Sequence, residues 1–297
     1  MRISDIDRKR SIPVSFEFFP PKNDNGWEDL FQTIKSLVPL HPSYVSVTYG
    51  AGGGTRSRTH DLVVRVQRET GIPVVAHLTC VGSTRNEIQA IVQQYVEKGI
   101  HNILALRGDV PRGMDSKDAF PADGFQHAAD LVQFIKEKFP QIGVGVAGFP
   151  EGHTETPNRL AEIDNLKAKI DAGADYVVTQ LFFDNRDFYD FCERCHFIDM
   201  DVPIIAGIMP IISRRNMIRM ADLAAGTRFP AALLRGIQRA HNDDYVRHVG
   251  VHWATEQVRD LIDHDVAGIH FYTLNRSRAS REICEALGLK DYLNLRA

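Results

Sequence analysis

Residues 12–19 read IPVSFEFF, and two prolines follow at once. An apolar run with β-branched and aromatic side chains that ends at prolines predicts a short buried strand. Alternation along this strand gives one side with Val14, Phe16 and Phe18 and another with Ser15, Glu17 and Phe19. Because the purely apolar side is expected to meet helices, we expect Glu17 to point into the middle of the fold.

The same kind of run recurs along the chain, and each run is followed by a longer stretch with helical spacing. The runs lie near 12–19, 44–50, 73–80, 101–109, 143–149, 176–183, 203–209 and 267–275. Eight strand–helix units without linker-like composition favour an α/β fold of the closed (β/α)8 TIM barrel type. A doubly wound open sheet is the weaker alternative. We therefore expect residues 1–297 to form a single catalytic barrel domain.

Two of the helical stretches close on glycines, which suit the residue that follows a helix. They are residues 85–99, which close on Gly99, and residues 160–173, which close on Gly173. The gap between the seventh and eighth runs is much longer than the others. Extra helices are therefore expected between strands 7 and 8, near 230–264.

The composition narrows the class of protein. Of 297 residues, 43% are hydrophobic, and the formal net charge is -3. This chain can bury a full core, but it has no basic footprint for nucleic acid or an anionic membrane. It shows no membrane-spanning run and no apolar export signal, and four cysteines are too few for a disulfide scaffold. We expect a cytoplasmic protein that acts on a small molecule.

Most of the expected strands begin apolar and end in side chains that can ionise or hydrogen bond. These ends carry Glu17, Thr48, His77, Thr79, Arg107, Asp109, Gln180, Asn275 and Arg276. In an α/β barrel the C-terminal ends of the strands form the face where active sites occur. We therefore expect these side chains to converge on one site.

Burial of Glu17 is expected to raise its pKa, which would make the side chain a proton donor near neutral pH. A structural carboxylate paired with an arginine is the alternative. His77, His153 and His270 are each compatible with a satisfied core or rim histidine. Of the three, His153 is favoured as a ligand contact because it precedes a polar helix.

The fourth run ends in ALRGD, which sets Gly108 between Arg107 and Asp109. A glycine there lets the backbone approach a ligand closely. An Arg–Asp pair that closes the barrel rim is the other interpretation.

The helical stretch after the fifth strand has two stripes. The expected buried stripe is Leu160, Ile163, Leu166 and Ile170, and the polar stripe is Glu162, Asn165 and Lys169. A solvated face is the usual meaning of a polar stripe, but this one could also bind ribose hydroxyls and a diphosphate. The expected loop at 49–60, with Gly52–Gly54, Arg56 and Arg58, could cradle phosphate, although it matches neither a P-loop nor a Rossmann fingerprint.

Residues 192–196 read CERCH, which matches the spacing of covalent haem attachment. Such attachment belongs to exported proteins, and the motif lies in an expected helix whose apolar residues need burial. We therefore favour chance spacing. A zinc site would need a second Cys or His pair at suitable spacing, so no metal is predicted.

In chain order, SFEFFPP, VSVTYGA, AHLTC, ALRGD, FPEGH, TQLFF, GIMP and HFYTLN resemble the flavin-dependent 5,10-methylenetetrahydrofolate reductases over essentially the full length. The resemblance is to the catalytic barrel alone, in the bacterial style. It implies noncovalent FAD and a ping-pong reduction of 5,10-methylenetetrahydrofolate by NADH or NADPH, in one-carbon metabolism that feeds methionine synthesis. It also suggests a homo-oligomer.

The resemblance implies a role for each matching residue. Glu17 would be the general acid that helps to open the folate ring, and Asp109 would lie by the flavin and the pterin. The implied flavin contacts are Thr48, His77, Leu78, Thr79, Arg107, Gly108, Asp109, Ala128, Phe149, His153, Glu162, Asn165 and Lys169. The implied nicotinamide contacts are Tyr49, Ala51 and Gln180. The implied folate contacts are Asp109, Gln180, Asn216, Met220 and Arg276.

Several positions depart from the family's pattern. Phe149 stands where tyrosine is usual, Met220 where a phenylalanine meets the substrate, Asn216 in place of a glutamine, and Glu162 where aspartate is common. These changes concern affinity rather than the class of reaction.

Two other functions stay open: a flavin-free barrel that binds folate for methyl transfer, and a non-catalytic subunit of a redox complex. The presence of Glu17, Asp109 and Gln180 argues against the second. The choice between NADH and NADPH is not set, because barrels of this kind lack the Rossmann acidic residue that reports on the ribose phosphate.

Overall fold

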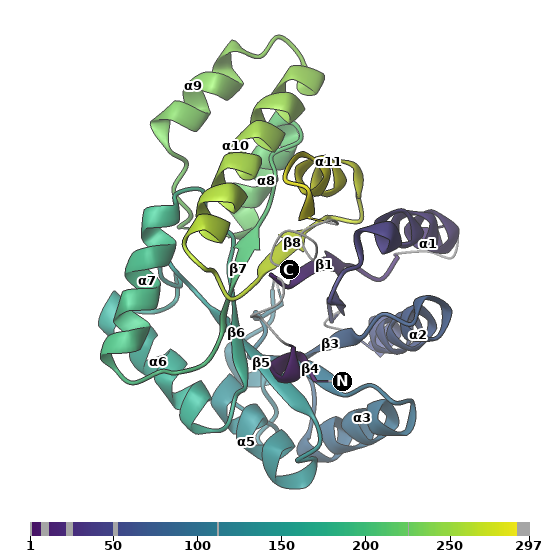
Figure 1. The fold of residues 1–297 in the computed structure, drawn as a ribbon. Helices are drawn as coiled ribbons and strands as arrows, with labels where there is room; N and C mark the ends of the chain where they lie inside the picture. The colour runs from purple at the N-terminus through teal and green to yellow at the C-terminus, as the bar shows by residue number, and fades with distance from the viewer. Residues whose placement is uncertain are drawn as a thin grey trace.

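The computed structural model describes residues 2–6, 12–21, 26–49, 53–111, 113–224 and 226–289. Its centre is a closed barrel of eight parallel strands in chain order, surrounded by helices (Figure 1). The strands are β1 (Val14–Phe18), β2 (Tyr44–Val47), β3 (Val74–Thr79), β4 (Asn102–Leu106), β5 (Gly143–Gly148), β6 (Tyr176–Thr179), β7 (Ile204–Ile208) and β8 (Ile269–Tyr272). The expected (β/α)8 barrel is confirmed, and the open sheet is wrong.

Most of the helices alternate with the strands and cover the outside of the barrel. They are α1 (Gly26–Leu37), α2 (Gly53–Thr70), α3 (Arg85–Glu97), α4 (Ser116–Ala119), α5 (Ala128–Lys138), α6 (Arg159–Asp171), α7 (Asn185–Phe197) and α11 (Arg278–Ala286). Short 3-10 helices lie at η1 (Ile3–Asp5) and η2 (Val38–Leu40). Gly99 and Gly173 follow α3 and α6 with φ of 74° and 105°, as expected for glycines that end helices.

The expected extra helices between strands 7 and 8 are present. Three helices follow β7: α8 (Arg214–Leu223) is the helix of the seventh strand–helix unit, and α9 (Ala231–Arg239) and α10 (Asp243–Asp263) are the extra helices expected near 230–264. In Figure 1 this group, here named the β7–β8 insertion, stands beside the barrel between α7 and α11. No helix in the described ranges is long and apolar enough to cross a membrane.

The interior of the barrel holds an apolar cluster and a set of buried polar side chains. Ile3, from η1, is 1% exposed, and its N–H donates to Asn102 Oδ1 over 2.9 Å. It packs on the apolar cluster, which is made of Tyr44, Val75, Leu104, Tyr176, Val178 and Ile205. The buried polar residues Ser15, Glu17, Ser46, His77 and His270 share this interior, and Glu17 and His77 lie nearer the C-terminal ends of their strands.

The apolar side of β1 meets the outer core, as its alternation predicts. Phe16 stacks on Phe271 with 5.7 Å between ring centroids, and both side chains are fully buried. In β4, Ala105 belongs to this outer core, whereas Leu104 and Leu106 belong to the interior cluster. Alternation therefore sorts the two faces of both strands correctly.

Three local expectations are wrong. The eighth strand ends at Tyr272 rather than near 275, because Leu274 and Asn275 adopt φ of 49° and 59°. The Asn275 amide then bonds both the N–H and the C=O of Phe19 at 2.8 and 2.9 Å. The expected loop at 49–60 is helical from Gly53 onward. Leu160, expected in the buried stripe of α6, is 76% exposed.

Candidate active site

Glu17 lies in the interior of the barrel, between two histidines. Its side chain is 9% exposed, and its Oε2 lies 3.5 Å from His77 Nε2 and 3.8 Å from His270 Nε2. His270 Nδ1 contacts the Ser15 hydroxyl at 2.7 Å, and its ring stacks on Tyr44. The expectation that Glu17 points into the barrel is confirmed, and among the described residues its ionisable neighbours are histidines in place of an arginine.

His77 is a neutral imidazole at neutral pH. Burial lowers its pKa to about 4; the Glu17 carboxylate opposes this shift, and His270 adds to it. The contact of His77 Nε2 with Glu17 lacks hydrogen-bond geometry, so this nitrogen has no hydrogen-bond partner among the described residues. The buried hydroxyl of Thr79 has none either within the same ranges. Two polar atoms on one strand are therefore available to a ligand.

The RGD turn after β4 brings the backbone close to β3. Gly108 has φ of 82°, and a Cβ there would lie 2.8 Å from Val81 Cγ2 and 3.0 Å from Thr79 Cβ. Only glycine fits this conformation without strain. Arg107 lies over the Phe120 ring at 4.5 Å and bonds Glu155 at 3.1 Å, while Asp109 is exposed.

The polar stripe of α6 is split by the fold. Glu162 is 4% exposed and accepts a hydrogen bond from the Thr156 hydroxyl at 2.7 Å. Lys169 Nζ donates to the Ala147 carbonyl at 2.8 Å, and burial lowers the pKa of this lysine to about 8 against the opposing effect of Glu162. Asn165 is exposed. A buried acid and a half-buried amine therefore lie near the end of β5.

Other expected flavin contacts line the same end of the barrel. Phe149, after β5, packs edge-on against His153 with 4.7 Å between centroids. Thr48 is half-buried and donates its N–H to the Phe18 carbonyl at 2.9 Å. Leu78 is fully buried in the outer core, so only its backbone can reach a ligand in the barrel. Ala128 begins α5.

The expected nicotinamide contacts are only partly described. Gln180 follows β6, is half-buried, and uses its side-chain oxygen to accept the Leu181 N–H at 2.9 Å. Tyr49 is half-buried and packs against the core. Ala51 lies outside the described residues.

Two expected folate contacts share a cavity of about 260 Å³ at the C-terminal ends of β7 and β8. Asn216 and Arg276 both line it, together with Tyr272 and Thr273. Met220 is fully buried and belongs to an apolar cluster with Met209 and Leu181. The structure therefore brings Asn216 and Arg276 together and leaves Met220 behind the wall of the cavity.

His270 is the neighbour of Glu17 that sequence analysis did not assign. The signal that could have found it is strand pairing. A closed barrel must pair β8 with β1, and alternation then sets His270 on the inward side opposite Ser15.

The CERCH cysteines lie in α7, as expected. Cys195 is 1% exposed in the outer core, and burial raises the pKa of both Cys192 and Cys195 to about 12. Both cysteines are therefore weakly reactive thiols. In the described ranges, no three His, Cys, Asp or Glu side chains gather as a metal ion would require.

A closed eight-stranded barrel with ionisable groups gathered at the C-terminal ends of its strands has the architecture of the α/β-barrel enzymes. A family model narrows this class. It is described as methylenetetrahydrofolate reductase and matches residues 2–288. The chain belongs to the methylenetetrahydrofolate reductase family.

Individual relatives agree with this assignment. The 5,10-methylenetetrahydrofolate reductase of Salmonella typhimurium is 39% identical over 280 residues, which cover 94% of this chain and 92% of the relative. Methylenetetrahydrofolate reductase (NADH) 1 of Arabidopsis thaliana is 37% identical over 301 residues, 98% of this chain and 50% of the plant protein. The family resemblance seen in the sequence motifs is confirmed.

A solved structure supports the fold. It is an uncharacterized protein from Clostridium thermocellum that binds two copies of 5-methyl-5,6,7,8-tetrahydrofolic acid. It matches with a TM-score of 0.66 at 18% identity, over 96% of each chain.

Proposed function

We propose that this protein reduces 5,10-methylenetetrahydrofolate to 5-methyltetrahydrofolate with NADH or NADPH, by ping-pong exchange through noncovalent FAD. One barrel carries the whole reaction, in the cytoplasm and as a homo-oligomer, and its product feeds methionine synthesis. The observation that carries the proposal is Glu17, a buried carboxyl group between two histidines at the C-terminal end of β1. Family membership supplies the reaction class.

Glu17 is the proposed proton donor. Opening the five-membered ring of the folate requires a proton on the nitrogen that leaves the bridging carbon, and a positioned carboxyl group can deliver it. His77 beside Glu17 is a neutral imidazole near pH 7, because burial lowers its pKa to about 4. His270 and Ser15 fix the side chain from the other side.

The residues at the strand ends fit a flavin. The unpartnered polar atoms of His77 and Thr79 can bond its polar edge, and Gly108 lets it approach the backbone. Lys169, Glu162 and Asn165 would hold its ribose and diphosphate, with Arg107, Thr48, Leu78, Ala128, Phe149 and His153 as further contacts. When bound, FAD would supply hydride acceptance from the nicotinamide and hydride donation to the folate.

The remaining residues would orient the two substrates. Asp109 would hydrogen bond the pterin and tune the flavin by its charge. Gln180 would contact the nicotinamide and the folate in turn, with Tyr49 and Ala51 at the nicotinamide. Arg276, Asn216 and Met220 would meet the rest of the folate; this requires Met220 to leave its buried position.

The first experiment is the visible absorption spectrum of the purified protein, incubated with FAD and then freed of unbound flavin, before and after NADH is added without oxygen. A two-banded flavin spectrum that bleaches, and then recovers on addition of 5,10-methylenetetrahydrofolate, is the expected result. In Glu17→Gln, bleaching should persist and folate-driven recovery should slow by about 100-fold or more. Folate binding without any flavin spectrum would favour the flavin-free methyl-transfer alternative.

A further inference from the structure

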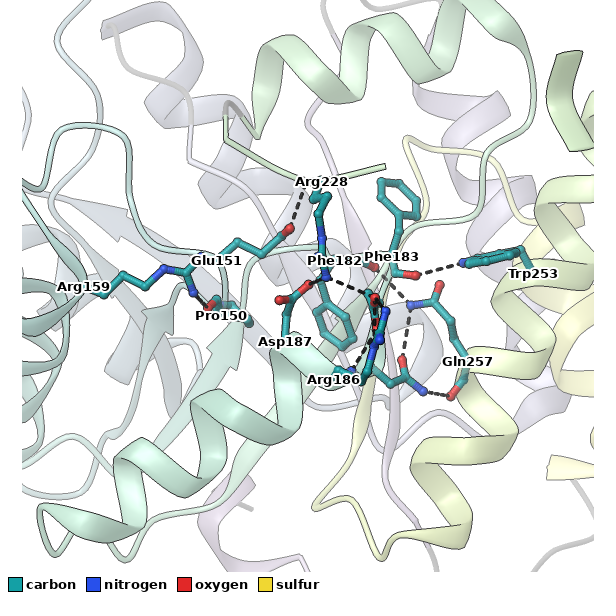
Figure 2. Close-up of polar contacts among 12 residues, drawn as sticks. Pro150, Glu151, Arg159, Phe182, Phe183, Arg186, Asp187, Arg228, Trp253 and Gln257 are labelled. Atoms are coloured by element: carbon teal, nitrogen blue, oxygen red, sulfur yellow. Dashed lines mark hydrogen bonds and ion pairs between the residues drawn. The ribbon is translucent and has the colours of Figure 1, made fainter. Parts of the chain in front are cut away.

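The segment that follows Gln180 is held by α10 of the β7–β8 insertion. Trp253 Nε1 donates to the Phe183 carbonyl at 3.0 Å, and Gln257 Nε2 donates to the Phe182 carbonyl at 3.2 Å (Figure 2). These two carbonyls are consecutive, so both peptide units are fixed from one helix. Gln257 itself is 7% exposed.

The connection between α8 and α9 holds the other end of this segment. Arg228 Nη2 bonds Asp184 Oδ2 at 3.0 Å and Asp187 Oδ2 at 2.8 Å. Its backbone N–H donates to Glu151 Oε1 at 2.8 Å, as Figure 2 shows. Phe229, the next residue, stacks on Phe183 with 4.7 Å between centroids.

These contacts tie two loops into one ring. At the barrel, the Gln180 N–H donates to the Gly148 carbonyl at 2.8 Å, which joins β6 to the end of β5. At the outer edge, Arg228 joins Glu151 of the β5–α6 loop to Asp184 of the β6–α7 loop. Gln180 therefore lies on a segment fixed at both ends.

The Arg228 contacts fix the position of the two loops relative to each other and contribute little to global stability. The Arg228 side chain is 55% exposed, and exposed ion pairs contribute roughly 0–1 kcal/mol. Asp184 is also bonded by Arg186 and caps α7 through the Arg186 N–H. Loss of Arg228 would leave Asp184 with Arg186 as its partner but would release Asp187 and the link between the loops.

We propose that Arg228, Trp253 and Gln257 are positioning residues that hold Gln180 for the hydride-transfer steps, so that the β7–β8 insertion acts as a clamp on the β6–α7 loop. This inference rests on the proposed function of Gln180. The insertion would then affect the reaction indirectly, because it contacts the loop that carries Gln180 and not the reacting groups.

Kinetics of the flavin-loaded enzyme test the clamp. Arg228→Ala should lower kcat/KM for the folate about tenfold, and Arg228→Lys should recover part of it, since lysine keeps the positive charge but lacks the planar guanidinium that fixes the geometry. Arg259→Ala is the matched control, because Arg259 is an exposed arginine of α10 that pairs with Glu256 in its own helix. Arg259→Ala should have the same kcat/KM for the folate as the wild type.

A double-mutant cycle shows whether Arg228 acts through Gln180. In the Gln180→Ala background, Arg228→Ala should lower kcat/KM for the folate by about twofold or less, because the side chain that Arg228 positions is already absent. A full tenfold loss in that background would overturn the proposal, as would wild-type kinetics in Arg228→Ala alone.

Hydrogen exchange gives a readout that does not depend on flavin. Amides in 181–187 should exchange faster in Arg228→Ala and in Trp253→Phe, which keeps the ring and loses the N–H donor, than in the wild type or Arg259→Ala. Trp27→Phe, at the other tryptophan, is the second control. Faster exchange with no turnover in the wild type would mean that the clamp exists and the proposed reaction is wrong. Unchanged exchange in both variants would overturn the clamp.

Discussion

At the scale of single residues, the chain buries ionisable groups where an ordinary core would be apolar. Glu17, His77 and His270 meet inside the barrel, and Glu162 and Lys169 lie near the end of β5. Burial of charge costs free energy unless partners or function compensate for it. Substitution of such a group is therefore expected to change the stability of the protein and its activity in different ways.

Lys169→Met separates the two effects. Burial lowers the pKa of Lys169 to about 8 from its ordinary 10.5, so the folded protein binds this proton less tightly than the unfolded chain. The contribution of this group to stability therefore grows as pH rises from about 8 to 10.5 and is unfavourable below that window. At pH 7 we expect Lys169→Met to leave the denaturation midpoint of the flavin-free protein unchanged or higher, and to weaken FAD binding about tenfold.

Fluorescence titration with FAD and urea denaturation measure these quantities. Lys167→Met, on the same helix but paired with Asp171 near the surface, is the control and should bind FAD as the wild type does. A large loss of stability in flavin-free Lys169→Met would contradict the prediction.

Glu151→Gln should raise stability in a pH-dependent way. Burial raises the pKa of Glu151 to about 6, with a smaller contribution from Asp187; the Arg228 N–H and the charges of Arg228 and Arg159 oppose it. Because the folded pKa exceeds the ordinary 4.5, the favourable contribution is complete below about pH 4.5 and is lost as pH rises through 6. Glutamine keeps the acceptor for Arg228 and carries no charge.

Thermal denaturation across pH 4.5–8 checks this sign. The midpoint of Glu151→Gln should exceed that of the wild type at pH 8, and the difference should shrink toward pH 5. Glu137→Gln changes an exposed glutamate that accepts a hydrogen bond from Gln133 in the same helix. It should show no such trend, and a pH-independent difference for Glu151→Gln would exclude the explanation.

At the scale of elements, the β7–β8 insertion docks through a glycine. A Cβ on Gly250 of α10 would meet backbone atoms of Ile211, in the loop after β7, at well under contact distance. The backbone of α10 therefore lies directly on that loop. This close approach sets the position from which Trp253 and Gln257 reach the β6–α7 loop.

Gly250→Ala should therefore lower the free energy of unfolding by about 1–3 kcal/mol through overpacking. Gly236→Ala in α9 is the contrast, because its new methyl would meet only the movable tip of Val249 and alanine favours a helix. Urea denaturation measures both, and equal costs at the two sites would refute the docking role of Gly250.

The sequence predicts the elements better than it predicts their contacts. The eight runs, the closing glycines of α3 and α6 and the inward direction of Glu17 all follow from local patterns. The prediction that Leu160 is buried is wrong. Helical spacing shows which residues share a face of the helix but not what that face packs against, and α6 buries Glu162 in that region instead. His270 and the Arg228 contacts required knowledge of which strands and loops meet, which is tertiary information.

At the scale of the whole molecule, the two ends of the barrel should respond differently to substitution. Ile3 packs on the apolar cluster inside the barrel at its N-terminal face, and Glu17 lies toward the C-terminal face. In barrels of this type the N-terminal face serves stability and the C-terminal face serves catalysis.

Ile3→Ala should lower the free energy of unfolding by about 2–4 kcal/mol and leave kcat/KM unchanged. Glu17→Gln should do the reverse, with folate turnover lost and the denaturation midpoint close to that of the wild type. Denaturation and turnover measurements on both variants test this difference between the two ends of the barrel. A large change in kcat/KM for Ile3→Ala would show that the two ends are coupled.

The pairing of β1 with β8 also sets the time at which the protein becomes functional during its synthesis. Ser15 and His270 touch across 255 positions of the chain, so a nascent chain on the ribosome carries Glu17 long before its histidine neighbour on β8 exists. Contacts this remote in sequence form late and slowly. The site is therefore among the last parts of the molecule to be assembled, and its appearance during translation would report barrel closure.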